Sequence, residues 1–276
     1  MSSEKYWVKA LDQTHLSITN NGLFPLNTTV VTSEYYNKND FIIRELDTSR
    51  FKKQNSYGPK HNPFNPWDKI LEIDKIGTNH QLILNKYPVQ KGHILLITNT
   101  WRPQDGWLDV NDWLAIQMVN KDTSGLWFFN SSPIAGASQP HRHFQLLRRA
   151  NGEITCPREK WFLDLEINND QDSKLKKNVV VSKFNFFDDS SNIYNLYLKL
   201  SKKVGLGNPI YDKKPRFPYN ILITNNWIAL IKRQYDHVHG FSINGLGFAG
   251  YLLLTEKSNI NYLKRCGPEK LLENFV

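Results

Sequence analysis

The chain has 276 residues, of which 40% are hydrophobic, and its formal net charge is +9. This length suits a globular protein with one large core or two modest lobes. Only two cysteines occur, the N-terminus carries no basic and apolar leader, and the apolar runs are far too short to span a bilayer. We therefore expect a cytoplasmic protein with no membrane partner.

The basic charge implies attraction to polyanions, which include nucleic acids, membranes and polyphosphate metabolites. The basic residues are scattered as short pairs, such as Lys176-Lys177 and Lys213-Lys214, rather than gathered in one long arm. Most such pairs are solvated surface, and no known nucleic-acid motif accompanies them. The sequence therefore does not predict a nucleic-acid partner.

The first predicted elements form a hairpin. Residues 80–87 and 93–98 are mostly apolar and are joined by a connection that contains proline and glycine, which predicts two buried strands. Residues 108–121 have apolar positions distributed around a helix, with Asp109 as the expected N-cap. Residues 126–130 then predict a strand that leads into a loop of small residues.

The chain becomes polar and charged between about residues 148 and 183. Its least core-like part is residues 168–174, which are mostly asparagine, aspartate and other polar types. We place a boundary or mobile crossing there, which divides the chain into residues 1–170 and residues 171–276.

A helix is predicted over residues 192–204, because apolar residues recur there at three-to-four spacing. Gly205 is placed to end this helix. A second hairpin pairs residues 219–224 with residues 227–232, and its Asn225-Asn226 turn tolerates positive φ.

The most informative motif is the run at residues 141–145, in which two histidines and a glutamine alternate with arginine and phenylalanine. An extended chain points every second side chain to one face, so a strand would present His141, His143 and Gln145 together. The preceding residues 130–140 are mostly small or hydroxyl types, which lets backbone amides approach an anion. Candidate nucleophiles and an anion cradle therefore lie within one loop and one strand of each other.

Two other interpretations of the paired histidines stay open on spacing alone. Histidines in a strand are often core or surface residues with ordinary hydrogen bonds, and alternate histidines can both ligate zinc. However, Cys156 and Cys266 lie far apart in the sequence and no further ligand run occurs, so a structural zinc site is not expected. A second pair, His237 and His239, lacks the small-residue loop and predicts an exposed turn.

Several segments, taken in their order and spacing, resemble one family. They are residues 62–66, 84–87, 129–132, 136–145, 217–224 and 242–250, and the block at 136–145, Gly-Ala-Ser-Gln-Pro-His-Arg-His-Phe-Gln, is the most specific. Nearly from end to end, the chain resembles the ATP adenylyltransferases, also called diadenosine tetraphosphate phosphorylases, in the transferase branch of the histidine-triad superfamily. The resemblance implies an α+β fold, a histidine-triad-like antiparallel sheet with outer helices. It also implies an N-terminal catalytic adenylyltransferase region at 1–170 and a C-terminal region at 171–276 that completes the nucleotide cleft.

The resemblance implies a chemistry as well. His143 would attack the α-phosphorus of diadenosine tetraphosphate, expel ATP and become adenylylated, after which inorganic phosphate would release ADP. An imidazole suits both steps, because it is nucleophilic when unprotonated and leaves phosphorus readily. His141 would order the site. Gln145 replaces a third histidine of the hydrolase branch and would donate to a phosphate oxygen without acting as an acid or a base.

The residues expected to bind substrate follow from the same matching. They are Lys53, Asn85, Lys86, Asn130, Gly136, Ala137, Ser138, Gln139, Asn244, Gly245, Leu246 and Tyr251, with backbone amides serving at Gly136, Ala137 and Ser138. Lys52 is the alternative to its neighbour Lys53. Two positions depart from the family: Thr255 stands where a lysine is common, and Tyr251 stands where a methionine is common. These departures leave the preference for the second nucleoside open.

No tightly bound cofactor is expected, and a Mg²⁺ ion would arrive with the polyphosphate, because no carboxylate cage is apparent. The expected partners are diadenosine polyphosphates, ATP, ADP and phosphate. A sugar-phosphate nucleotidylyltransferase is one alternative, but those enzymes carry His-Pro-His and often cysteine or histidine metal ligands. A non-catalytic nucleotide sensor is another, and the intact His143 and Gln145 argue against it.

Overall fold

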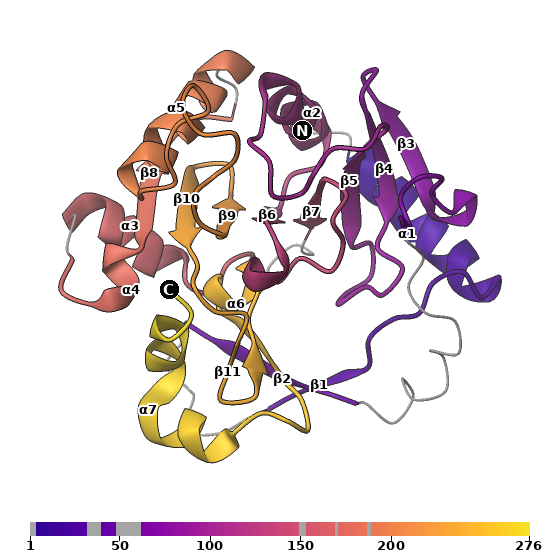
Figure 1. Ribbon diagram of the computed structural model, residues 1–276. Helices are drawn as coiled ribbons and strands as arrows, with labels where there is room; N and C mark the ends of the chain where they lie inside the picture. The colour runs from indigo at the N-terminus through magenta and orange to yellow at the C-terminus, as the bar shows by residue number, and fades with distance from the viewer. Residues whose placement is uncertain (1–3, 32–39, 48–61, 149–152, 169–170, 187–188) are drawn as a thin grey trace.

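A central antiparallel sheet organises the part of the chain that the computed structural model describes, residues 4–31, 40–47, 62–148, 153–168, 171–186 and 189–276 (Figure 1). Its strands run in the order β3-β4-β5-β7-β6-β9-β10-β8. In chain order they are β3 (Glu72–Ile76), β4 (His80–Leu84), β5 (Ile94–Thr98), β6 (Leu126–Asn130), β7 (His143–Leu147), β8 (Val179–Lys183), β9 (Tyr219–Ile223) and β10 (Trp227–Lys232). The predicted α+β architecture is therefore confirmed.

Helices cover both faces of the central sheet. One face packs against α1 (Lys5–Thr19), α2 (Val110–Asp122) and α5 (Ser190–Lys203). The other face packs against α3 (Glu159–Asn168), α4 (Lys174–Lys177), α6 (Gly245–Phe248) and α7 (Ile260–Glu273). Two short 3₁₀ helices, η2 (Lys69–Leu71) and η3 (Pro133–Ala135), lie in connections. No helix among the described residues has the length and apolar character that crossing a membrane requires.

A second, smaller sheet runs beneath the central one in Figure 1 and contains β1 (Thr28–Val30), β2 (Ile42–Leu46) and β13 (Tyr251–Leu254). β13 pairs with β2 in parallel, with Tyr251 opposite Ile42. This pairing brings the beginning of the chain against its C-terminal part. A short hairpin, β11 (His237–Val238) and β12 (Phe241–Ser242), extends nearby.

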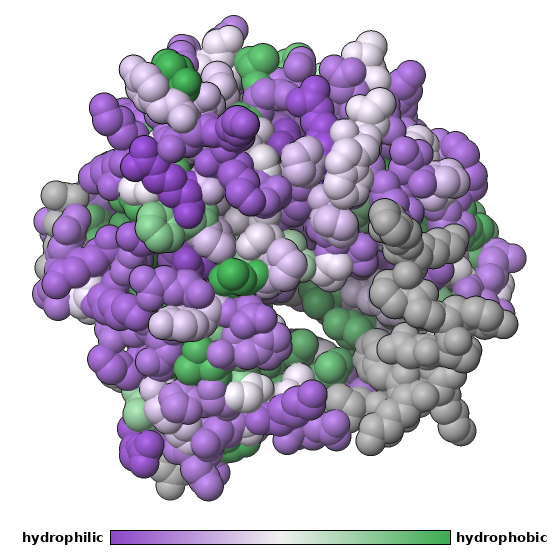
Figure 2. Space-filling view, viewed as in Figure 1, coloured by the Kyte–Doolittle hydropathy of each residue, from purple (hydrophilic) through white to green (hydrophobic). Residues whose placement is uncertain are grey.

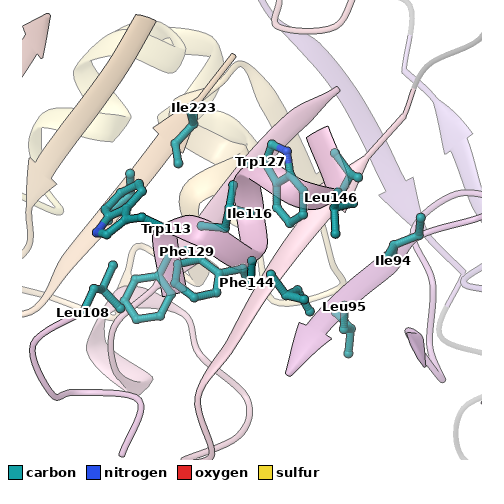
Figure 3. Packing of buried hydrophobic residues seen from close by; sticks show 14 of the residues in the cluster. Ile94, Leu95, Leu108, Trp113, Ile116, Trp127, Phe129, Phe144, Leu146 and Ile223 are labelled. Carbon is teal, nitrogen blue, oxygen red and sulfur yellow. The ribbon is translucent and has the colours of Figure 1, made fainter. Parts of the chain in front are cut away.

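The central strands are buried on both faces, because apolar residues follow one another along them and successive side chains point to opposite faces. Trp127 and Phe129 of β6 join the cluster under α1, α2 and α5, whereas Leu126 and Phe128 join the cluster on the opposite face. Figure 3 shows the first cluster, in which the rings of Phe129 and Phe144 lie 4.9 Å apart between centroids.

The two halves of the chain share this sheet. β6 belongs to the first half and β9 to the second, and the two strands pair directly, with Phe128 opposite Leu222. A continuous ladder of hydrogen bonds thus crosses from one half of the chain to the other. The division into residues 1–170 and 171–276 stays a prediction.

Most predicted elements are confirmed. Both hairpins form, as β4 with β5 and β9 with β10. Asp109 caps α2 in a capping box, since its side chain accepts from Asn111 and Asp112 while Asp112 accepts from the Asp109 backbone. Gly205 follows α5 with a φ of 85°. Both members of the pair at 237 and 239 are exposed, as predicted, but only His239 lies in the turn, because His237 belongs to β11.

Two details differ from the sequence analysis. The polar stretch at 148–183 holds α3, α4 and β8, and its apolar side chains Phe162, Leu165 and Leu175 are buried in the core. A few apolar residues on one face suffice to dock a short helix, although the overall composition is polar. The Asn225-Asn226 turn does not use positive φ, because among the described non-glycine residues only Glu4, Asn21 and His239 adopt it.

Candidate active site

A pocket of about 140 Å³ opens beside the start of β7. On β7, Phe144 and Leu146 pack into the cluster under α2, so His143 and Gln145 point to the opposite face of the sheet. Both of these side chains line the pocket. The other walls come from the 63–71 segment, the end of the β4 strand, and the loop before β7, and include Phe64, Asp68, Ile83, Asn85, Lys86, Ser138 and Gln139.

The imidazole of His143 is held in the form that a nucleophile requires. Its Nδ1 lies 2.8 Å from the carbonyl oxygen of His141, so the Nδ1–H group donates there. Burial lowers the pKa of His143 to about 4, which leaves the ring neutral near pH 7. Nε2 has no hydrogen-bond partner within the described part of the chain and is the nitrogen free to attack.

Gln104 fixes the backbone of His143. The strands β6 and β7 separate at this level, since their pairing ends with Phe128 opposite Gln145. The Gln104 side chain bridges the gap: its Oε1 accepts from His143 N at 2.8 Å, and its Nε2 donates to the carbonyl oxygens of Asn130 at 2.7 Å and His143 at 3.1 Å. The buried amide replaces the missing ladder bonds and holds the reactive residue in place.

His141 is buried and does not line the pocket. Its Nε2 lies 2.8 Å from the carbonyl oxygen of Thr98, and its Nδ1 lies 3.1 Å from Asn62 Oδ1. Burial lowers the pKa of the His141 ring. The residue thus presents its carbonyl, not its ring, to His143, which fits the ordering role that the family resemblance implies.

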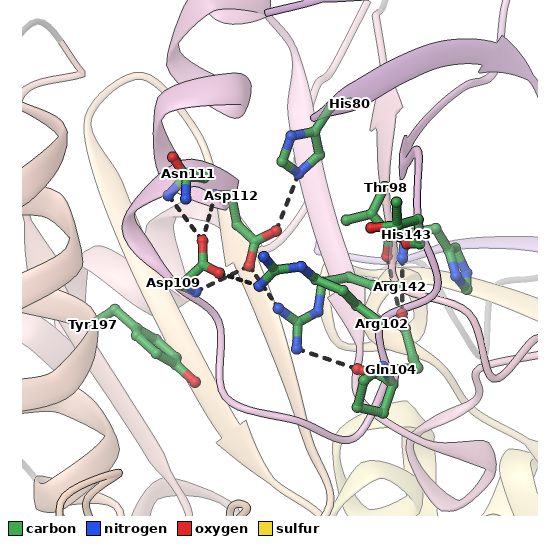
Figure 4. Close-up of polar contacts among 12 residues, drawn as sticks. His80, Thr98, Arg102, Gln104, Asp109, Asn111, Asp112, Arg142, His143 and Tyr197 are labelled. Carbon is green, nitrogen blue, oxygen red and sulfur yellow. Dashed lines mark hydrogen bonds and ion pairs between the residues drawn. The ribbon is translucent and has the colours of Figure 1, made fainter. Parts of the chain in front are cut away.

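A buried charge cluster anchors the residue between the two histidines (Figure 4). Arg142 Nη1 donates to Asp112 Oδ2 at 2.9 Å, and His80 Nε2 lies 3.1 Å from the other carboxylate oxygen. Burial opposes ionisation of Asp112, but the His80 hydrogen bond and the Arg142 charge prevail and lower its pKa. Because Asp112 also accepts from the Asp109 backbone in the capping box of α2, this carboxylate ties the start of β7 to the start of that helix.

Asn130 connects the pocket region with the C-terminal half. It is buried, and its Oδ1 accepts from Gly245 N at 2.9 Å and from Asn220 Nδ2 at 2.8 Å. Its Nδ2 is a buried donor without a partner among the described residues. An unsatisfied buried amide donor is costly, and an anionic ligand oxygen would satisfy it.

The loop amides are only partly available. Gly136 N donates to Pro133 O at 2.8 Å, and Ala137 N donates to Ser132 O at 2.9 Å, so both serve the turn itself. Ser138 lines the pocket, and its amide donates to no backbone acceptor in the described ranges. In this conformation the cradle expected from three amides is reduced to one of them.

A second pocket, of about 610 Å³, lies between the central sheet and the small sheet. Its walls include Asn244, Leu246 and Tyr251, with Arg44 from β2 and Leu147 from β7. Figure 2 shows a hollow with hydrophobic walls just above β1 and β2. Residues 143, 145 and 147 alternate along one face of β7, so the two pockets follow each other along that face.

The residues expected from the sequence therefore divide between two places. The first pocket holds His143, Gln145, Asn85, Lys86, Ser138 and Gln139, and the second holds Asn244, Leu246 and Tyr251. Gly136, Ala137, Asn130 and Gly245 lie in the connecting backbone, and Lys53 lies outside the described residues. Thr255 instead closes a turn, with its amide 3.0 Å from Ser258 Oγ.

Three residues in or beside these pockets were not found from the sequence: His93, Gln104 and Arg44. His93 and Gln104 contact Gln145 and His143 from distant parts of the chain, Arg44 lines the second pocket, and none belongs to a local motif. His93 and Gln104 could have been suspected only as polar residues within or beside apolar segments.

Comparison with known proteins decides the family. The sequence-family model of the Ap4A phosphorylase N-terminal domain matches residues 1–160. The sequence-family model of the ATP adenylyltransferase C-terminal domain matches residues 173–276. The chain belongs to the Ap4A phosphorylase family. Ap4A is diadenosine tetraphosphate, so the family inferred from the motifs is confirmed.

Two proteins from Saccharomyces cerevisiae are similar to this chain in sequence. Diadenosine 5',5'''-P1,P4-tetraphosphate phosphorylase 2 is 22% identical over 93% of this chain and 87% of its own length. Protein APA1 is 25% identical over 73% of this chain and 74% of its own length. The crystal structure of yeast Ap4A phosphorylase Apa2 in complex with Ap4A superposes with a TM-score of 0.72, at 20% identity, over 100% of this chain and 97% of that one. The likeness shows a shared fold.

Proposed function

We propose that this protein catalyses the phosphorolysis of diadenosine tetraphosphate to ATP and ADP through an adenylyl-histidine intermediate. The observation that carries the proposal is the His143 imidazole, neutral and with a free Nε2, at a pocket of a chain that belongs to this family. Its named relative from Saccharomyces cerevisiae is a diadenosine tetraphosphate phosphorylase.

Two displacements make up the reaction. His143 Nε2 attacks the α-phosphorus, the bond from that phosphorus to the bridging oxygen breaks, and ATP leaves. A phosphate oxygen then attacks the same phosphorus, the phosphorus–nitrogen bond breaks, and ADP leaves while the imidazole returns to its neutral form. Because Nδ1–H stays bonded to the His141 carbonyl, the ring can share the positive charge of the intermediate without losing its orientation.

The arrangement of the two pockets supports a substrate with two nucleosides. The adenylyl group that reacts must lie in the first pocket, because its phosphorus has to reach His143. The departing ATP portion then extends along β7 toward the second pocket, where Tyr251 and Leu246 offer an apolar wall. Lys86 lies at the first pocket and provides a cation for the polyphosphate.

Gln145 favours transfer to phosphate over hydrolysis. Its carboxamide can donate to a non-bridging oxygen, but it cannot remove a proton from water near neutral pH. A Mg²⁺ ion, carried in on the polyphosphate, would neutralise part of the substrate charge.

One incubation with labelled inorganic phosphate tests the proposal. We expect equal amounts of ATP and ADP from diadenosine tetraphosphate, with the label in ADP. Label in neither nucleotide would indicate hydrolysis or a different substrate and would overturn the proposal.

The variant His143→Ala tests the covalent step. It should abolish turnover while binding of the substrate is retained, because the pocket walls stay in place. His239→Ala is the matched control, since this histidine lies on an exposed turn and stacks on Tyr262 with 3.7 Å between ring centroids. Turnover by His143→Ala at the rate of the His239→Ala control would rule out the intermediate.

A further inference from the structure

His93 lies beside Gln145 and has no part in the two displacements described above. It directly precedes β5 and is only 2% exposed. Its Nε2 lies 2.9 Å from Gln145 Oε1. β5 and β7 are neighbouring strands with Leu95 opposite Gln145, so the pairing of the strands fixes this contact.

The neighbouring hydrogen bonds set the direction of the contact. Tyr87 N donates to Asn85 Oδ1 at 3.0 Å, which turns the Asn85 Nδ2 group toward His93 Nδ1, 3.4 Å away. An amide nitrogen can only donate, so Nδ1 is the unprotonated nitrogen of His93. The ring proton is therefore on Nε2 and is donated to Gln145 Oε1.

The orientation of the Gln145 carboxamide follows from this chain of bonds. With its oxygen occupied by His93, its Nε2–H₂ group is the end that stays available at the pocket that Gln145 shares with His143. Burial lowers the pKa of His93 to about 3, so the ring keeps the neutral form that this arrangement needs at any pH where the protein would act.

We propose that His93 is a positioning residue of this site, which turns the Gln145 amide so that it donates to a non-bridging oxygen of the phosphoryl group bound at His143. The inference rests on the proposed function and names a residue that acts through Gln145. A donor aimed at an oxygen that gains charge stabilises the transition state more than the bound substrate. The effect of losing it should therefore fall on kcat more than on KM.

Two substitutions separate positioning from packing. His93→Leu fills the space but donates nothing. We expect kcat to fall about 10- to 100-fold with a smaller change in KM, because the Gln145 donor is misdirected rather than removed, and removing one such donor costs about 100- to 1000-fold. His93→Gln can place an amide N–H near the position of Nε2 and should restore most of kcat. Equal kcat for wild type and His93→Leu, or loss of kcat in both variants alike, would overturn the proposal.

A double variant tests whether His93 acts through Gln145. In the Gln145→Ala background, adding His93→Leu should cause no further loss of kcat, because the amide that it orients is gone. Losses that multiply as if independent would contradict the proposal. If wild type itself does not convert diadenosine tetraphosphate, the proposed function fails first, and that result is distinct from either outcome here.

A spectroscopic measurement on the wild type does not depend on any variant folding. Nitrogen-15 NMR of histidine-labelled protein near pH 7 should show His93 as the neutral Nε2–H form. An Nδ1–H form or a protonated ring would overturn the assignment of donors.

Discussion

At the scale of single residues, the site depends on the tautomer and the protonation state of one imidazole. His143 is buried, and the His141 carbonyl takes its Nδ1 proton. Burial makes the ring less basic, but it also keeps Nε2 unprotonated over a wide range of pH. The His143 ring is therefore a weaker nucleophile than a more basic imidazole, but in nearly every molecule it is in the unprotonated form that can attack.

The low pKa of His143 predicts the pH dependence of the first displacement. The attacking form is the neutral ring, so kcat/KM for diadenosine tetraphosphate should fall only as the pH drops toward about 4. A histidine with the ordinary pKa would lose activity below about 6.5. The measurement is kcat/KM from pH 8 downward, with activity regained at pH 7 after each acid exposure as the control for unfolding. A reversible loss centred near pH 6.5 would show that the ring is not shielded as described.

The same residues illustrate what the sequence could predict. The alternation of His141, His143 and Gln145 is local, so the strand and its reactive face follow from spacing alone. Gln104 and His93 contact this strand from 39 and 52 positions away. Such pairings depend on which strands become neighbours in the sheet, and that information is absent from a local pattern.

At the scale of secondary structure elements, one carboxylate serves both a helix and a strand. Asp112 completes the capping box of α2 and also accepts from Arg142 at the start of β7. The dipole of α2 further favours a negative charge at its N-terminus. The position of the reactive histidine is therefore coupled to the integrity of the α2 N-terminus.

Asp112→Ala should consequently be strongly destabilising. It leaves Arg142 buried without its counter-ion, which typically costs about 3–5 kcal/mol in the free energy of unfolding. Activity at moderate temperature should also fall, because Arg142 adjoins His143. Asp105→Ala is the control, since its ion pair with Lys214 is exposed and should be worth at most about 1 kcal/mol. Urea denaturation of both variants gives the comparison, and similar losses would contradict the anchoring role.

Prediction of elements succeeded where signals were local. The α2 helix carries its own cap at Asp109, and β6 is a continuous apolar run. The small sheet was not predicted, because β2 and β13 become partners only after the two ends of the chain meet. The second pocket depends on this sheet, so its shape was equally hidden.

At the scale of the whole molecule, the C-terminal half is fitted directly against the small-residue loop. Gly136 has a φ of 89°, and a Cβ atom at this position would lie 2.5 Å from Asn244 Cβ and 2.8 Å from Asn244 Cα. Next to this contact, Gly245 N donates to Asn130. The missing side chain at Gly136 therefore allows the C-terminal half, which contributes Asn244 and Leu246 to the second pocket, to meet the loop that lines the first.

Gly136→Ala tests this fit, with Gly205→Ala as a matched control. Both glycines have positive φ, so each alanine should cost about 1–2 kcal/mol of backbone strain. A Cβ at Gly205 meets nothing within 4 Å, whereas one at Gly136 overlaps Asn244 and must displace the loop or the 243–246 segment.

We expect Gly205→Ala to keep wild-type kcat/KM, and Gly136→Ala to lose about 10- to 100-fold, because a small misplacement of substrate groups is costly. Thermal unfolding measures the backbone strain that the two variants share. The kcat/KM measures the effect of displacing the loop or the 243–246 segment. Equal kcat/KM for the two variants would mean that the halves need not touch at Gly136 for the reaction to proceed.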